Sequence, residues 1–410
     1  MNSWKSDVDI LHAAQYDGRY GGFSKGHLHV DRDDRLWLPL TVYFPDAEQR
    51  TDAWAPVQKN TVLISEDKGL IWSFTDQPFP GPSHNRVTLS DETIVEVGGS
   101  GYLRYPRTEV ERLEEDGYHV WDLGPENDYC AIVYGMWQKR STDGGNTWEK
   151  REIHQQLPHF AHFVARGPLR LLDDGSLVYF AYGCTPEERI PVEEDPTAAT
   201  EGFLHRYGHG RWSAYCVRSD DSGETWQSIR AADGRLSPSV HGFNETFPII
   251  GNDGSMFVVL RTELGSHAYS VSSSDGGRTW TEAVQTPIRA KHPLPTLLRD
   301  GAIVCSYQRR FAAPFGVRAR FTSDRGETWG EEIVLRDDIL LSDGLAESDT
   351  VEFSDGTLFT AFQATKPDDQ GRQRPFVAGT RWTRDYRGPF VPGFEIPEPG
   401  EKFNAEGNDQ

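Results

Sequence analysis

The sequence predicts an all-β protein built as a six-bladed β-propeller. A short turn of Asp-Gly type recurs six times between apolar runs rich in Val, Ile, Phe and Tyr, which is the usual hairpin signature. A second turn, Ser-x-Asp-x-Gly-x-x-Trp, follows most of these hairpins. Units of three to four strands must stack on neighbours to bury both faces, so a ring explains the repeat better than a sandwich.

The first type of turn marks the hairpin between the first two strands of each unit. These turns lie at Asp33-Asp34, Asp91-Glu92, Asp174-Gly175, Asp253-Gly254, Asp300-Gly301 and Asp355-Gly356. The second type follows five of them, as SEDKGLIW (65–72), STDGGNTW (141–148), SDDSGETW (219–226), SSDGGRTW (273–280) and TSDRGETW (322–329). Its glycine allows positive φ, and its Ser and Asp can bond nearby amides. The sixth unit keeps only GTRW (379–382).

We expect one propeller domain over residues 1–392, closed by an N-terminal strand such as Asp9–Ala14 that completes the last sheet. Residues 393–410 are polar and rich in Pro and Gly, as expected for a C-terminal tail. Two of the intervals between turns, Asp91 to Asp174 and Asp174 to Asp253, are long enough to hide a degenerate unit. A seven-bladed ring is therefore the alternative, and long insertions at the rim are the preferred interpretation.

Composition excludes several classes of function. The 63 acidic and 42 basic residues give a formal charge of −21, which opposes binding to nucleic acid or to an anionic membrane. No run approaches the roughly 18 apolar residues of a membrane span. The N-terminus has no signal-like segment, which favours the cytoplasm, although a mature secreted chain behind a new Met would look the same. The 4 cysteines lack C-x-x-C spacing and are expected to be buried free thiols. No cofactor or metal is predicted.

Strand periodicity selects a set of residues at one end of the ring. Side chains alternate along a strand, so a fixed even offset from each turn gives an equivalent position in every unit. Eight residues before the turn Asp stand Lys25, Ser83, Arg166, Glu245, His292 and Glu347. Eight residues after it, on the second strand, stand Thr41, Gly99, Tyr182, Arg261, Gln308 and Gln363. The first set is entirely polar, and we expect it to surround the centre, although strand ends can also be polar because they meet water.

Long links between the second and third strands reach the same end of the ring. They span Phe44–Asn60, Ser100–Asn127 and Gly183–Trp212 in the first half of the chain, whereas later links are short. Long loops at one end of a rigid scaffold are typical of a binding site. This end is therefore the predicted site.

The Ser-x-Asp-x-Gly-x-x-Trp turns resemble the Asp boxes, or BNR repeats, of the sialidase superfamily of β-propellers, over roughly Gly21 to Trp382. The resemblance implies a sialidase-like fold with the boxes on the face away from the active site. By position, Glu245 is similar to the Glu that supports the Tyr nucleophile of sialidases. Arg261 and Arg320 are similar to the second and third of the three arginines that bind the substrate carboxylate, and Asp52 to the acid/base Asp.

Two departures from the sialidase pattern argue against sialic acid as the substrate. Where sialidases carry Arg-Ile-Pro, this chain has Ser24-Lys25-Gly26, and Lys25 supplies charge without bidentate geometry. Glu347 stands where the Tyr nucleophile belongs. Beside Glu245, an ionised Glu347 would repel an anionic sugar, and the pKa of one of the two carboxyls would rise.

The predicted function is an exo-acting glycoside hydrolase that releases a terminal sugar, acidic or next to a uronate, from an oligosaccharide or polysaccharide. Such reactions use one carboxylic acid to protonate the leaving oxygen and one carboxylate to attack or to activate water. Asp52 is the candidate acid/base, and Glu245 and Glu347 are the nucleophile or its partner. Arg261 and Arg320 are expected to orient the substrate.

Two alternatives remain open. A polysaccharide lyase or rhamnose-releasing enzyme would act on uronate-containing glycans with a His or Tyr as base and cations that neutralise the uronate. The residues available for these roles are His27, His29, His84, His292 and Tyr182, with Lys25 and Arg166. The other alternative is a sugar-binding propeller without catalysis. The sequence does not predict the oligomeric state.

Overall fold

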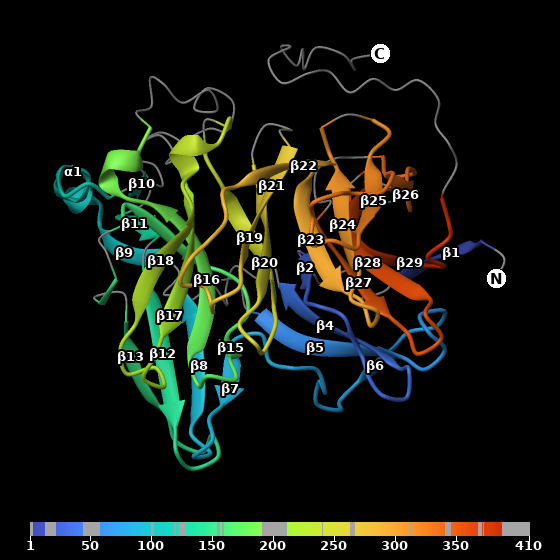
Figure 1. Cartoon of the computed structure of the whole chain (residues 1–410), viewed down its shortest axis with the longest axis horizontal. Helices are drawn as coiled ribbons and strands as arrows, with labels where there is room; N and C mark the ends of the chain where they lie inside the picture. Colours follow the sequence, from blue (N-terminus) through green and yellow to red (C-terminus); the bar gives the residue numbers. More distant parts are fainter. Residues whose placement is uncertain are drawn as a thin grey trace.

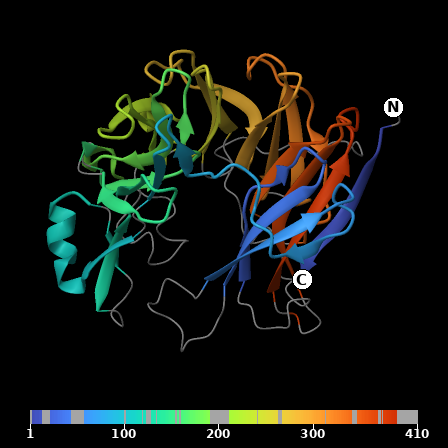
Figure 2. The ribbon, with the colours of Figure 1, turned by 90° about the horizontal axis from the view of Figure 1, so that it is seen from below.

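The structure is almost entirely β-sheet, with the sheets ranged around a common centre (Figures 1 and 2). It is a computed structural model that describes residues 3–12, 22–43, 58–99, 102–118, 120–122, 128–133, 135–153, 156–157, 160–190, 211–239, 241–262, 267–311, 313–340, 346–367, 371 and 373–387. Six sheets of four or five strands form the blades of a propeller. The predicted six-bladed ring is confirmed.

The first three blades come from the first half of the chain. The first contains β2 (Gly22–Lys25), β3 (His29–Val30), β4 (Leu36–Tyr43), β5 (Gln58–Ser65) and β6 (Ser73–Thr75). The second contains β7 (Arg86–Thr88), β8 (Ile94–Gly99), β12 (Met136–Ser141) and β13 (Glu149–Glu152). The third contains β14 (His162–Ala165), β15 (Arg170–Leu171), β16 (Leu177–Cys184), β17 (Ser213–Ser219) and β18 (Gln227–Ala232).

The last three blades follow the same plan. The fourth contains β19 (Asn244–Ile250), β20 (Met256–Arg261), β21 (His267–Ser273) and β22 (Val284–Arg289). The fifth contains β23 (Lys291–Leu297), β24 (Ile303–Arg309), β25 (Gly316–Thr322) and β26 (Ile333–Val334). The sixth contains β27 (Ala346–Glu352), β28 (Leu358–Pro367), β29 (Gln373–Trp382) and β1 (Lys5–His12).

The long interval between the turns at Asp91 and Asp174 holds an insertion and not a seventh blade. Between β8 and β12 the chain forms a small separate sheet and a short helix, at one side of the molecule (Figure 1). These elements are β9 (Tyr102–Pro106), the 3-10 turn Arg107–Glu109, α1 (Val110–Glu115), β10 (Val120–Asp122) and β11 (Tyr129–Val133). The sequence did not predict α1, which is too short to give a clear periodic pattern. Two further 3-10 turns lie at Pro186–Glu188 and Gly234–Leu236.

The ring closes through a sheet built from both ends of the chain. Strand β1 pairs antiparallel with β29, so that Lys5 lies opposite Trp382 and Asp9 opposite Ala378. The closing strand therefore begins earlier than the expected Asp9–Ala14. Figure 2 shows the blue strands of the first blade beside the orange and red strands of the sixth, which contact them.

Apolar side chains join successive blades. Every residue of β20 is buried, because one face of the strand packs on the third blade and the other on the fifth. Phe257 of β20 shares a cluster with Cys305 and Tyr307 of β24, and Leu38 of β4 shares one with Phe359 of β28. The four cysteines are free and buried, as expected. None of the helices in the described part of the chain is long and apolar enough to cross a membrane.

The Asp boxes cap the blades by a repeated set of hydrogen bonds. In the fourth box, Ser273 Oγ accepts from the Gly277 amide at 3.0 Å and donates to Asp275 at 2.8 Å. Asp275 accepts from the Thr279 amide at 2.9 Å, and Trp280 Nε1 donates to the Gly277 carbonyl at 3.0 Å. Gly277 has φ +82°, which the turn requires. The boxes therefore have the structural role that the sequence predicts.

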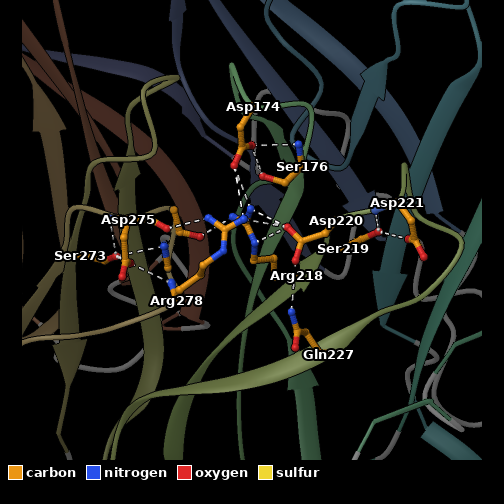
Figure 3. Close-up of polar contacts among 12 residues, drawn as sticks. Asp174, Ser176, Arg218, Ser219, Asp220, Asp221, Gln227, Ser273, Asp275 and Arg278 are labelled. Carbon is orange, nitrogen blue, oxygen red and sulfur yellow. Dashed lines mark hydrogen bonds and ion pairs between the residues drawn. The ribbon is translucent and has the colours of Figure 1, made fainter.

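The boxes and the Asp-Gly turns lie at the same end of the blades, which we call the box end. The Gly276 amide of the fourth box bonds to the Gly254 carbonyl of the neighbouring turn at 3.1 Å. Salt bridges then link the third blade to the fourth (Figure 3). Buried Arg218 lies 3.0 Å from Asp174 and donates to the Gly276 carbonyl at 2.6 Å, and Arg278 reaches Asp220 at 3.1 Å.

We predict that Ser273→Ala lowers the free energy of unfolding by about 1–3 kcal/mol, because it leaves the buried Gly277 amide without an acceptor. Chemical denaturation measures the change. Ser272→Ala is the matched control, since this neighbour bonds to Thr281 through its backbone amide and carbonyl, which the substitution leaves in place. Equal stability of the two variants would contradict the capping role of the box.

Candidate active site

At the end of the ring opposite the boxes, the innermost strands of three consecutive blades carry a β-bulge at the same place. The register shifts between Asn244 and Thr246 in β19, between Lys291 and Leu294 in β23, and between Ala346 and Asp349 in β27. A bulge adds a residue to one strand and redirects its side chain, and bulges are frequent beside active sites. The bulges contain Glu245, His292 and Glu347, three of the residues selected by strand periodicity.

The backbone at two of these residues is strained. Glu245 has φ +42° and His292 has φ +49°, in the left-handed region that is uncommon for residues other than glycine. Such conformations cost about 1–3 kcal/mol each and cluster at functional sites. Packing and ion pairs around the two residues must therefore hold them in place.

Arg166 connects the two glutamates across the centre of the ring. Its Nη2 donates a hydrogen bond to Glu347 Oε1, and its Nη1 lies 3.8 Å from Glu245 Oε1. The guanidinium lies over the Phe247 ring, 5.1 Å from the ring centroid. One cation from the third blade thus joins carboxylates from the fourth and sixth blades.

Glu245 is the more enclosed of the two glutamates. Arg261 Nη1 donates to its Oε2, and His292 Nδ1 lies 3.0 Å from the same oxygen. Burial alone would raise the pKa of Glu245, but Arg261, His292 and Arg166 together hold it well below its usual range. Glu245 is therefore a carboxylate at any pH near neutrality. We call Arg166, Glu245, Arg261, His292 and Glu347 the central cluster.

Two histidines stack beside this cluster. The rings of His27 and His84 are 5.0 Å apart and inclined by 18°. Burial and the nearby charges of His27, Arg170 and Arg166 lower the pKa of His84 to about 3, although part of its surface meets solvent. His84 is therefore a neutral imidazole. The nearby charge of Glu347 raises the pKa of His84, but the other groups outweigh it.

Asp349 lies next to His27, and the sequence analysis did not identify it as a site residue. Its Oδ2 accepts a hydrogen bond from the Leu28 amide at 2.5 Å and lies 3.5 Å from His27 Nδ1. The carboxylate is buried, whereas 44% of the His27 side chain is exposed. Asp349 follows the bulge in β27, which shifts the register and cannot be predicted from a fixed offset.

Arg170 is a second residue that the sequence analysis missed. Its Nη1 donates to the Leu169 carbonyl at 2.9 Å, and no carboxylate in the described part of the chain pairs with it. Burial without an anionic partner lowers its pKa, and its charge contributes to the low pKa of His84. The site therefore holds one cation that the neighbouring acids do not neutralise.

The other candidate residues are placed as follows. Tyr182 on β16 is close enough to Arg166 to raise the pKa of the guanidinium, and its ring lies 5.8 Å from that of Trp212. Lys25 ends β2 opposite Leu40, and its side chain lies outside the described part of the structure. Asp52 lies outside the described residues altogether.

The structure does not bring Arg320 to the central cluster. This residue is on β25, the third strand of its blade, opposite Cys305 and two residues before the fifth box. Its Nη1 donates to the Gly330 carbonyl at 2.6 Å, which follows that box. The position carried over from the sialidase pattern therefore does not supply a third arginine to the cluster in this structure.

A pocket of about 250 Å³ lies at the box end, between the third and fourth blades. Its acids are already engaged: Asp174 bonds to Ser176 and Arg218, and Asp275 to the amides of its own box. In the described part of the chain no three His, Cys, Asp or Glu side chains are grouped as a metal site requires. The central cluster is the better candidate because its ionisable groups come from four blades and converge.

Comparison with known proteins agrees with this architecture. A family model described as a BNR repeat-like domain matches residues 118–293. A sialidase from Micromonospora viridifaciens is 22% identical over 277 residues, which cover 63% of this chain and 41% of that protein. The chain thus spans well under half of the length of this relative.

Solved structures with the same fold include a protein of unknown function from Dyadobacter fermentans, with a TM-score of 0.60 and 21% identity over 93% of this chain and 98% of that one. Trypanosoma rangeli sialidase in complex with sialic acid matches with a TM-score of 0.47 and 12% identity, over 93% of this chain and 59% of that one. Six blades, five Asp boxes and the matched BNR and sialidase sequences together support a divergent member of the sialidase superfamily.

Proposed function

We propose that this protein is an exo-acting glycoside hydrolase that removes a terminal sugar from an oligosaccharide or polysaccharide. The observation that carries the proposal is the placement of two carboxylates, Glu245 and Glu347, on either side of the Arg166 guanidinium. Glycoside hydrolysis needs a carboxylate at the anomeric carbon, and the matched sialidase sequence supports this class of reaction.

The two carboxylates have different surroundings and so different roles. Glu347 is the nucleophile, because its side chain is 27% exposed, against 15% for Glu245, and because it accepts a hydrogen bond from Arg166. Glu245 is 15% exposed and holds Arg261, Arg166 and His292, so it is the partner that fixes the positions of these groups. Arg166 favours the ionised form of Glu347, which a nucleophile requires.

We further propose that the glycan carries an acidic group, on the terminal sugar or on a neighbouring uronate. Arg170 supports this because it is a largely buried cation that pairs with no carboxylate of the described residues, and a bound anion would offset its desolvation. Sialic acid is a poorer candidate: Arg261 already bonds to Glu245, and Arg320 contacts the box end of its blade. A uronate fits a single guanidinium that has no carboxylate partner among the described residues better than it fits a three-arginine site.

A lyase acting by β-elimination on a uronate glycan is the second candidate. Arg170 lies close to the His27–His84 stack, which favours this candidate. The cation can neutralise the carboxylate of a uronate while an imidazole removes the proton on the neighbouring carbon. A panel of chromogenic glycosides and uronate polysaccharides distinguishes the two candidates. Released sugar without a new ultraviolet absorbance supports hydrolysis, a conjugated double bond supports the lyase, and binding without any product contradicts both.

We predict that Glu347→Gln lowers kcat/KM for the best substrate of that panel at least about 100-fold, because the amide cannot attack the anomeric carbon. Glu245→Gln should cause a loss of similar size, since it releases Arg261 and His292. The control is Glu352→Gln, on the same strand as Glu347. The Glu352 carboxylate accepts a hydrogen bond from the Arg299 amide and lies outside the cluster. Full activity of either cluster variant removes that residue from the mechanism.

We also predict that Arg170→Gln raises KM for a uronate-containing substrate about 10- to 100-fold and changes kcat little, because a hydrogen-bonded charge pair contributes about 1.5–3 kcal/mol. Substrates without an acidic group should be unaffected. Arg325→Gln is the control, since this arginine lies in the fifth box. If Arg170→Gln leaves the KM for acidic substrates as unchanged as the KM for neutral ones, the acidic-substrate proposal is contradicted. The proposal of glycoside hydrolysis is not.

A further inference from the structure

Neither glutamate of the central cluster can give up a proton. Glu245 is held as a carboxylate by Arg261, His292 and Arg166, and Glu347 accepts a hydrogen bond from Arg166. A carboxyl bonded to a guanidinium is ionised and cannot protonate a leaving group. If the protein cleaves glycosides as proposed, the general acid must come from outside the two glutamates.

His27 fits this role better than His292, because 44% of its side chain is exposed, against 15% for His292, whose Nδ1 lies 3.0 Å from Glu245 Oε2. His27 lies between β2 and β3 of the first blade, and its ring stacks on that of His84. His84 is in turn close enough to Glu347 and Arg166 for both charges to act on its pKa. The exposed imidazole of His27 is therefore connected to Glu347 through His84, which stacks on His27 and whose pKa responds to the charge of Glu347.

Asp349 gives this imidazole a fixed orientation. The buried carboxylate is held by the Leu28 amide at 2.5 Å, and its Oδ2 faces His27 Nδ1 at 3.5 Å. Catalytic hydrogen bonds are often long in the free enzyme and tighten when substrate binds. A carboxylate behind Nδ1 fixes the tautomer and leaves Nε2 as the atom that exchanges protons with a substrate.

We propose that His27 is the general acid and base of the glycosidase reaction and that Asp349 is its positioning residue. The proposal rests on the proposed function and deepens it. It differs from the sialidase pattern, in which the acid/base is the Asp that Asp52 resembles. Among the described residues, two charged or titratable groups face His27: Asp349 from β27 and His84 from the link between β6 and β7. Beyond His84 lie Arg166, Arg170 and Glu347.

The proposed reaction forms and then breaks a covalent bond between the sugar and Glu347. The His27 imidazolium gives its Nε2 proton to the glycosidic oxygen, which leaves with the electron pair of the broken C–O bond, while a Glu347 oxygen bonds to the anomeric carbon. A water molecule then attacks this carbon and passes a proton to Nε2. The carbon–Glu347 bond breaks with its electrons returning to the carboxylate. The sum is one glycoside and one water converted to one sugar and one alcohol, with His27 protonated again.

His84 supports this role without titrating itself. Its low pKa keeps the ring neutral, so it stacks on His27 without adding a like charge when His27 is protonated. The Leu169 amide bonds to the His84 carbonyl at 2.8 Å and so anchors the link to the third blade. The stack therefore fixes the distance between His27 and the central cluster.

The test compares two glycosides of the sugar that the panel identifies. Dinitrophenolate is a good leaving group and departs from its glycoside without protonation. Methylumbelliferone is a poorer leaving group, and its departure is assisted by a general acid. His27→Gln should lose about 100- to 10,000-fold in kcat/KM on the second substrate and less than about 10-fold on the first. Asp349→Asn should show the same pattern with a smaller loss. Glu347→Gln should lose activity on both substrates alike.

The matched control is His29→Gln, two residues away in β3, where the ring packs edge-on against Phe79 and has no role in the cluster. It should behave as wild type on both glycosides. The proposal is overturned if His27→Gln affects both substrates equally or neither. It is also overturned if Asp52→Asn, and not His27→Gln, is selective for the poor leaving group.

A measurement without turnover separates this proposal from the glycosidase proposal. Nitrogen-15 NMR should find the neutral His27 ring protonated at Nδ1 in wild type and shifted toward the Nε2–H form in Asp349→Asn. A protein with this tautomer that hydrolyses no glycoside contradicts the proposed function. A protein that hydrolyses glycosides but lacks the Nδ1–H form contradicts the role of Asp349.

Discussion

The ion pairs of Arg166 are the interaction on which the centre of this protein depends. Two carboxylates that project toward one axis would repel each other and take up a proton unless a cation lay between them. The Arg166 guanidinium bonds to Glu347 and approaches Glu245, and the two glutamates in turn favour its charged form. Three blades are thereby joined at the end of the ring that has no Asp boxes.

The rest of the fold brings these groups together at a cost in backbone energy. The bulges in β19, β23 and β27 turn one extra residue of each strand toward the axis, and two of those residues adopt positive φ. Such strain persists only where the surroundings determine the geometry. The apolar clusters between blades and the buried Arg218 pairs at the box end provide that rigidity.

Much of the architecture could be read from the sequence, because both turn types have local hydrogen-bond requirements that restrict their residues. The constant offset from each turn also found Arg166, Glu245, His292 and Glu347, since blades of like construction place like positions on one axis. Offsets could not find Asp349, which follows a bulge, or Arg170, whose charge acts on His84. Lys25 and Asp52 stay predictions, because their side chains lie outside the described residues.

The shared last sheet has a consequence for how the chain is made on the ribosome. Strand β1 emerges first, yet its hydrogen-bonding partner β29 ends at Trp382, so β1 must wait through the synthesis of nearly all the other strands. During that time it presents an unpaired edge, which is a target for aggregation and for pairing with another chain. Lys5, Asp7 and Asp9 place charge along this edge and help to keep the waiting strand soluble.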